Sequence, residues 1–202
     1  MKNQFHCILL PVFLVLGACM PSQTPEMPSR AIGDLGSELP PMRVFAAPQP
    51  ENFPISNSDL VRDFIDLSFE LESGRSLPVF TRFEGPVTVR VTGAPSPTLG
   101  PDLSRLLYRL QTEAGINITQ TNDPDANITI ESVSRAQIRS HLPHAACFVV
   151  PNISRLSEFR LARRSPRTDW ARLTTRERLA IFIPNDTTPQ EVRDCLHEEL
   201  AQ

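Results

Sequence analysis

Apolar residues recur along residues 57–202 with two different periods, one typical of helices and one typical of strands. Spacings of three and four residues predict a helix that follows a Ser58 or Asp59 cap, begins near Leu60 and ends near Gly74, a second helix over 101–114 and a last helix that begins at Thr188. A short helix is expected over 134–141. Alternating or β-branched runs predict strands at residues 86–92, 116–119, 127–133, 145–150 and 178–183.

The order of these elements is helix, strand, helix, strand, strand, short helix, strand, strand, helix, and no internal repeat is present. This order predicts an α+β fold, with a mixed or antiparallel sheet and helices packed against it. The last helix begins with Thr188, Pro189 and Glu191, which match a capping box with proline in the first turn. Because the sequence stops inside this helix, we expect a single domain over 57–202 that is truncated at its C-terminus.

Residues 1–18 have the pattern of a targeting segment, with Lys2 ahead of an apolar run over 7–16 that is too short to span a bilayer. The sequence Leu-Gly-Ala-Cys that ends at Cys19 resembles the lipobox of bacterial lipoproteins. That resemblance implies cleavage before Cys19 and an acyl anchor on this residue. An ordinary secretory signal with a chance cysteine is the alternative interpretation.

A lipid anchor at Cys19 predicts a protein of the cell envelope that is attached to a membrane. Met20 follows the cysteine, whereas an aspartate there favours the inner membrane in enteric bacteria, so the outer membrane facing the periplasm is favoured. Residues 19–56 are rich in proline and polar residues and have no sustained period. We therefore expect an extended or disordered tether between the anchor and the domain.

The composition excludes little. The formal net charge is −3, and Lys2 is the only lysine, so the positive charge of the domain is all arginine. No nucleic-acid partner is expected for an exported, anchored protein. Eight arginines fall within 155–178, and they suit either contact with anionic lipid headgroups or cell-wall polymer, or a solvated face with local ion pairs, which is the favoured interpretation.

Two cysteines remain after the signal and the lipidated residue are set aside, Cys147 and Cys195. In the oxidising compartment that the signal implies, they are expected to form a disulfide, with two separate buried thiols as the alternative. The bond would close a loop of roughly fifty residues and contribute about 4 kcal/mol in the chain-entropy model.

The last helix carries the beginning of an HExxH zinc motif, His197 followed by Glu198. In that motif His197 would be a metal ligand and Glu198 the general base that activates metal-bound water. The position one turn after His197 is Ala201, which cannot bind a metal. The favoured interpretation is structural and needs no cofactor: a buried stripe of Val192, Cys195, Leu196 and Leu200, with residues 197–199 as a polar flank.

Three stretches, at residues 63–75, 82–90 and 195–202, together resemble a proteobacterial family of unknown function, numbered 2927, which includes candidate lipoproteins. This resemblance implies no established activity. It does imply that the family continues past residue 202 into a segment with glycine and aspartate, so this chain is expected to be a fragment or a natural truncation.

The strands followed by a His-Glu helix are also similar to a minimal zincin scaffold, and by that analogy the strand at 178–183 would flank a substrate cleft. Two hypotheses about function follow. The first is a non-catalytic, degenerate zincin-like domain that binds an envelope protein or a cell-wall polymer. The second is a zinc-dependent metallopeptidase whose remaining ligands lie beyond residue 202.

Overall fold

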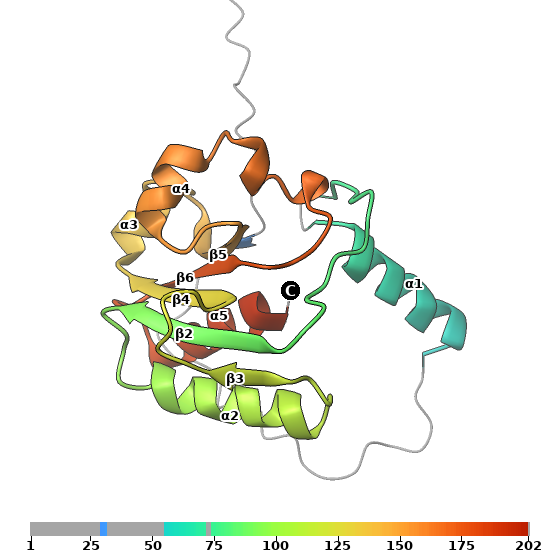
Figure 1. The fold of residues 1–202 in the computed structure, drawn as a ribbon, viewed down its shortest axis with the longest axis horizontal. Coiled ribbons are helices and arrows are strands. Elements are labelled where there is room, and N and C mark those ends of the chain that lie inside the picture. Colours follow the sequence, from blue (N-terminus) through green and yellow to red (C-terminus); the bar gives the residue numbers. More distant parts are fainter. Residues whose placement is uncertain (1–28, 32–54, 72–73, 202) are drawn as a thin grey trace, which may run out of the picture.

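The computed structural model of the chain describes residues 29–31, 55–71 and 74–201. In this part of the chain, six strands form one sheet in the order β1-β5-β6-β4-β2-β3, and helices lie on both of its faces (Figure 1). The strands are β1 (Ser29–Ala31), β2 (Val87–Gly93), β3 (Ile118–Gln120), β4 (Ile128–Val133), β5 (Ala145–Pro151) and β6 (Leu179–Pro184). The helices are α1 (Asn57–Phe69), α2 (Leu99–Thr112), α3 (Arg135–Arg139), α4 (Leu156–Ala162) and α5 (Pro189–Ala201).

The sheet is mixed, as the sequence predicts. Strand β2 runs parallel to both β3 and β4, and β4 runs parallel to β6. Strand β5 is antiparallel to β6, and β1 is antiparallel to β5. The parallel pair β2 and β3 is joined through α2, because a parallel connection has to cross back over the sheet. The α+β class is therefore confirmed.

The central strands are buried on both faces, and each face has its own core. Along β6, Leu179, Ile181 and Ile183 belong to the core under α2 and α5, whereas Ala180 and Phe182 belong to the core under α3 and α4. All residues of β5 and β6 are buried, which explains why their sequences are continuous apolar runs without alternation.

Helix α5 is fixed to the sheet and to α2 by two different interactions. The predicted disulfide between Cys147 of β5 and Cys195 of α5 is present, with the two Cα atoms 5.9 Å apart. Arg193 of α5 donates from Nε to Asp102 of α2 over 3.1 Å, and Arg105 pairs with the same buried carboxylate. The last helix of the chain is thus held against both of its neighbours.

The structure differs from the sequence prediction in two segments. Residues 29–31, inside the expected tether, form β1, because their backbone pairs with the free edge of β5. No helix or strand is predicted between residues 151 and 177, but this segment contains α4 and two short 3-10 helices, Pro166–Thr168 and Trp170–Arg172. Helix α4 is too short for its apolar spacing to stand out against the arginines around it.

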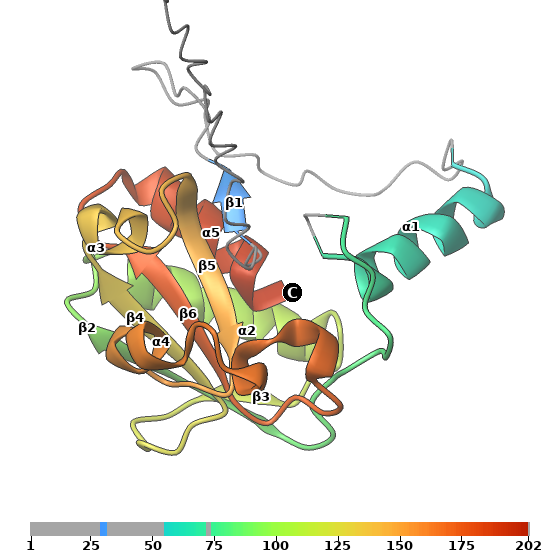
Figure 2. The ribbon, with the colours of Figure 1, turned by 90° about the horizontal axis from the view of Figure 1, so that it is seen from above.

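Helix α1 stands beside the rest of the domain and not on the sheet (Figure 2). It begins at a Ser56 cap, whose Oγ accepts a hydrogen bond from the Asp59 amide over 3.1 Å, and ends at Phe69, earlier than the expected Gly74.

The expected signal peptide and Cys19 lie outside the described residues. None of the described helices combines the length and the apolar character that crossing a membrane requires.

Loss of the disulfide should lower the stability of the domain substantially. The bond joins residues 48 apart in sequence, so it restricts a large loop of the unfolded chain. We expect the double variant Cys147→Ala, Cys195→Ala to lose about 4 kcal/mol of unfolding free energy. Urea unfolding of the two proteins in oxidising buffer measures this loss. A difference of less than about 1 kcal/mol would contradict a stabilising role for the bond.

Candidate functional site

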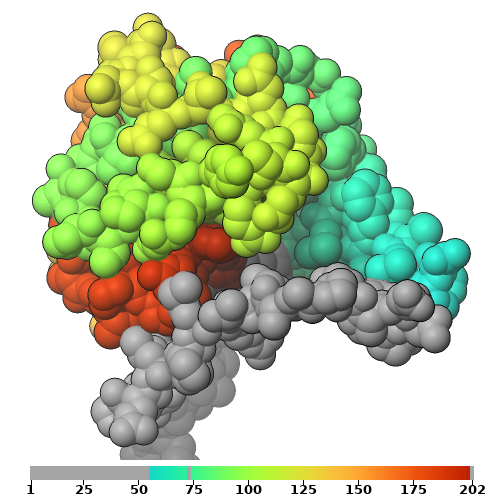
Figure 3. Space-filling view, turned by 90° about the horizontal axis from the view of Figure 1, so that it is seen from below, coloured from blue at the N-terminus to red at the C-terminus, as the bar shows by residue number. Residues whose placement is uncertain are grey.

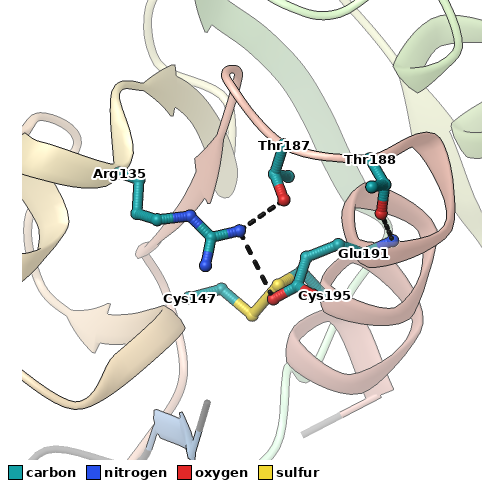
Figure 4. The surroundings of a disulfide bond; sticks show 6 residues. All are labelled: Arg135, Cys147, Thr187, Thr188, Glu191 and Cys195. Atoms are coloured by element: carbon teal, nitrogen blue, oxygen red, sulfur yellow. Dashed lines mark hydrogen bonds and ion pairs between the residues drawn. A yellow bond between two sulfur atoms is a disulfide. The ribbon is translucent and has the colours of Figure 1, made fainter. Parts of the chain in front are cut away.

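Helix α5, which carries His197 and Glu198, begins with half of the predicted capping box. Thr188 accepts a hydrogen bond through Oγ1 from the Glu191 amide over 3.3 Å. The Glu191 carboxylate does not complete the box, because it lies 3.9 Å from Arg135 at the start of α3 (Figure 4). Arg135 also bonds to Thr187, so the loop into α5 is tied to α3 close to the disulfide.

The two motif residues lie next to each other near the C-terminal end of α5. His197 is exposed, Glu198 is half-buried, and the preceding Cys195 and Leu196 are fully buried. The pKa of His197 lies below its ordinary value of 6.5, first because the ring is partly desolvated and second because Arg109 of α2 is close. His197 therefore belongs to the polar boundary between α5 and α2.

The predicted buried stripe of α5 is correct for Val192, Cys195 and Leu196, but the expected polar flank is wrong at Glu199. Glu199 is 2% exposed and Leu200 is only partly buried. The helical repeat explains this, because Glu199 follows Val192 by seven residues and Cys195 by four, which places it on their face.

No group of three His, Cys, Asp or Glu side chains within the described ranges is arranged to hold a metal ion. His141, another histidine of the domain, packs edge-on against Phe159 with ring centroids 5.6 Å apart. Phe159 belongs to the core under α3 and α4, whereas α5 packs on the opposite face of the sheet (Figure 1). The sheet therefore separates His141 from His197.

The strand before α5 does not flank a cleft. By analogy with zincins, the strand at 178–183 was expected to line one, but β6 is hydrogen-bonded on both sides, to β4 and to β5. With both of its edges occupied and every residue buried, β6 has no free edge for an extended substrate. The expectation is therefore wrong for this strand.

A cavity of about 750 Å³ lies between α1 and the segment that leads into β2. In the space-filling view, α1 stands next to the α2 and β3 side of the domain with a recess between them (Figure 3). The apolar part of the lining comes from α1, from the first residue of β2 and from the segments before β2 and β3, and includes Phe64, Leu67, Phe80, Phe83, Val87 and Ile116. The polar part includes Thr81, Arg82, Glu84, Asn117 and Arg176.

Arg176 forms the inner polar wall of this cavity. Its Nε donates to Thr81 Oγ1 over 3.2 Å, and its guanidinium lies 5.4 Å from the ring centroid of the buried Trp170. Burial lowers the pKa of Arg176, although an arginine remains charged at neutral pH. The cavity thus combines aromatic walls with one oriented cation, an arrangement that suits an apolar group with a negative or polar end.

Sequence reasoning found the apolar stripe of α1 but missed the cavity beside it. Phe80 and Phe83 lie outside every predicted helix and strand, and Arg176 is one of the eight arginines within 155–178. The cavity depends on residues that are about a hundred positions apart, such as Phe64 and Arg176, so no local pattern could show it. One available signal was the unusual width of the apolar arc on α1, where Val61 and Ile65 lie beside the stripe.

The described chain is thus a disulfide-bonded α+β domain whose mixed sheet is covered by helices on both faces. The chain belongs to the family described as "Protein of unknown function (DUF2927)", whose model matches residues 57–202. Comparison with the curated proteins and with the solved structures finds no match. Strand β1 lies outside the matched residues, although it pairs with β5.

An NMR titration should give His197 a midpoint below 6.5, because desolvation and the nearby Arg109 both disfavour the imidazolium form. Since the folded pKa is below the unfolded value, the contribution of His197 to stability is present above pH 6.5 and is lost as the pH falls through the folded pKa. Arg109→Gln should raise the midpoint of His197. The titration midpoint of His141 should not change, because burial, Arg160 and Arg163 lower the pKa of this residue and Arg109 does not contribute. A midpoint of His197 at or above 6.5 would contradict this placement.

Proposed function

We propose that this chain is a lipid-anchored protein of the bacterial cell envelope, and that its domain binds a partner without catalysing a reaction. The Leu-Gly-Ala-Cys sequence that ends at Cys19 supports the anchor, and Met20 supports the outer membrane, facing the periplasm. The disulfide between Cys147 and Cys195 agrees with an oxidising compartment. In this proposal the partner is an envelope protein that docks on α1.

The observation that carries the binding role is the exposure of the apolar stripe of α1. This helix has the spacing of a core helix, yet none of its residues is buried. Its large apolar side chains are exposed to the following extents: Leu60 43%, Val61 62%, Phe64 61%, Ile65 46% and Leu67 85%. By contrast, α2 buries Leu99, Leu103, Leu106 and Leu107.

An isolated helix of this length has little intrinsic stability. Helix α1 has 13 residues, and helices shorter than about 12–15 residues are marginal in water without packing on one face. A contiguous exposed apolar surface on a folded protein marks an interaction site. Cover from a partner would therefore stabilise α1 and remove the apolar surface from water at the same time.

The charges on α1 indicate which charge the binding surface of the partner carries. Asp59, Asp63 and Asp66 follow each other at spacings of four and three residues, so they form an acidic stripe along the helix. Arg62 pairs only with Asp59, over 3.0 Å. Two copies of this chain would bring two such stripes together if they paired through α1, which like-charge repulsion disfavours. The partner that fits has an apolar surface with basic residues beside it.

A photo-crosslinking side chain in place of Phe64 should join the protein to one discrete partner in cells that produce it. The matched control is the same side chain in place of Tyr108 on α2, which is 66% exposed compared with 61% for Phe64. We expect a crosslinked species from position 64 and none from position 108, read on a denaturing gel and identified by mass spectrometry.

Reversing the charge of two acidic residues on α1 distinguishes a specific complex from non-specific hydrophobic association. The double change Asp63→Lys, Asp66→Lys leaves the apolar stripe intact but should lower the yield of the crosslink at least about tenfold, because it places like charges against a basic partner. A crosslink that persists unchanged, or one that appears equally from both positions, would refute α1 as the binding surface.

A zinc-dependent metallopeptidase is the second candidate, because His197 is exposed beside Glu198 on a helix that the disulfide holds in place. In that candidate His197 is a zinc ligand, Glu198 is the general base, and the further ligands lie beyond residue 202. The native full-length protein should then carry about one zinc ion per chain, measured by mass spectrometry of the metal. His197→Ala should lose the zinc, whereas Glu198→Gln should keep it and lose hydrolysis. A folded native protein without zinc would remove this candidate.

A further inference from the structure

The arginines of α4 and of the turn that follows it have no acidic partner in the part of the chain that the structure describes. Arg160, Arg163 and Arg164 are all exposed, and none of them makes an ion pair or a side-chain hydrogen bond there. Elsewhere in the domain a carboxylate lies within 4.0 Å of most guanidinium groups, namely those of Arg62, Arg75, Arg82, Arg105, Arg109, Arg135, Arg172, Arg178 and Arg193. The sequence-based expectation of local ion pairs is therefore wrong for these three arginines.

Two of the acidic residues within 155–178, Glu158 and Asp169, are engaged elsewhere. Glu158 of α4 is partly buried and accepts a hydrogen bond from the Ser154 amide over 3.4 Å. Asp169 accepts from Arg75 over 2.8 Å, lies 3.8 Å from Arg172 and caps the 3-10 helix at Ala171. Neither carboxylate neutralises the outer side of α4, so the local charge is strongly positive although the net charge of the chain is −3.

The three exposed arginines lie within three sequence positions of an exposed leucine. Leu156, Phe159 and Ala162 are buried at intervals of three residues and fix the inner side of α4. Arg160 and Leu161 therefore point outward, and Arg163 and Arg164, which lie in the turn after the helix, are exposed as well. Leu161 is 90% exposed, the largest exposure among the big apolar side chains of the described residues. We call Arg160, Leu161, Arg163 and Arg164 the α4 surface.

The positive field of the α4 surface extends to the end of α3. The pKa of His141 is lowered, first by burial and then by the charges of Arg160 and Arg163. No described carboxylate offsets these charges at His141. Arg160 and Arg163 are thus both close enough to His141 for their charges to act on its ring.

We propose that the α4 surface lies on an anionic phospholipid bilayer, with its guanidinium groups on lipid phosphates and Leu161 inserted at the headgroup level. A guanidinium matches a phosphate in geometry and is weakly hydrated, so it binds lipid phosphate readily. An exposed leucine between arginines has the two parts that interfacial binding requires, apolar insertion and electrostatic attraction. An acidic protein would use the arginines but would leave the projecting Leu161 without a role.

The proposed anchor would keep this surface close to lipid, and in this respect the inference rests on the proposed function. Cys19 and Ser29 of β1 are ten positions apart, so an acyl chain on Cys19 holds β1 within about 35 Å of the bilayer. One lipid anchor and one basic surface are the two signals that stable membrane attachment requires. The acidic α1 would be repelled by the same bilayer, which leaves it available for a protein partner.

An environment-sensitive fluorophore on α4 tests the contact directly. In the full chain with Cys7→Ser and Cys19→Ser, the change Ser157→Cys gives one free thiol on the exposed side of α4, and Ser104→Cys gives a matched thiol on α2 across the sheet. The probes are vesicles of phosphatidylethanolamine with phosphatidylglycerol, and vesicles of phosphatidylethanolamine with phosphatidylcholine. We expect a blue shift of the label at position 157 with the anionic vesicles only, and no shift at position 104.

Matched variants assign the effect to the α4 surface. The triple change Arg160→Gln, Arg163→Gln, Arg164→Gln should raise the half-maximal vesicle concentration roughly 100-fold, since each basic residue near an anionic surface contributes about a factor of five. The control variant removes the same amount of positive charge from other parts of the surface, by the changes Arg62→Gln, Arg82→Gln and Arg109→Gln. Its half-maximal vesicle concentration should change by less than about threefold, because charges far from the bilayer are screened by salt. Leu161→Ser should weaken the shift, whereas Tyr108→Ser on α2, at a position 66% exposed, should not.

Several results would overturn the proposal. A shift with both kinds of vesicle, or an equal shift at positions 157 and 104, would show that the apolar N-terminal segment carries the chain to the bilayer without contact by α4. A shift that inorganic phosphate alone reproduces would indicate an anion site and not a lipid surface. No shift at position 157 in a chain that is folded by circular dichroism would leave the arginines to an acidic protein partner. The anchor at Cys19 is absent throughout, so these outcomes do not depend on it.

Discussion

Strands β5 and β6 are buried on both faces, and this constraint organises the rest of the domain. A sheet that is apolar on both sides has to be covered twice, so α2 and α5 pack on one face while α3 and α4 pack on the other. The disulfide joins β5 to α5, and the ion pair between Asp102 and Arg193 joins α2 to α5. Both interactions act where the covering helices meet the sheet, and they keep the end of the chain in place.

Helix α1 differs from the other helices because it covers neither face of the sheet. Its apolar side chains have the spacing of a core helix, but the two faces of the sheet are already covered without it. The helix instead forms one wall of a cavity whose inner wall carries Arg176 above Trp170. An apolar stripe that the fold does not use has to be explained by something outside the fold.

Charge divides the surface into an acidic helix and a basic one. Helix α1 carries its carboxylates in one stripe, whereas α4 and its following turn carry arginines that no described acid neutralises. The net charge hides this division, because the two regions largely cancel. Under the proposed function, the α4 surface faces the bilayer and α1 faces the protein partner.

The sequence by itself determined the α+β class, the places of most helices and strands, and the buried stripe of α5 through Val192 and Leu196, because each of these follows from local periodicity. It also determined the pairing of Cys147 with Cys195, because these are the cysteines that remain after the signal and the lipidated residue are set aside. Only the tertiary structure decided that α1 stays uncovered, that β6 is an interior strand, that Glu199 is buried, and that no described acid pairs with Arg160, Arg163 or Arg164. These properties depend on which distant segments lie next to each residue. A period along the chain defines the face of a helix, but what covers that face is set by contacts between segments far apart in the sequence.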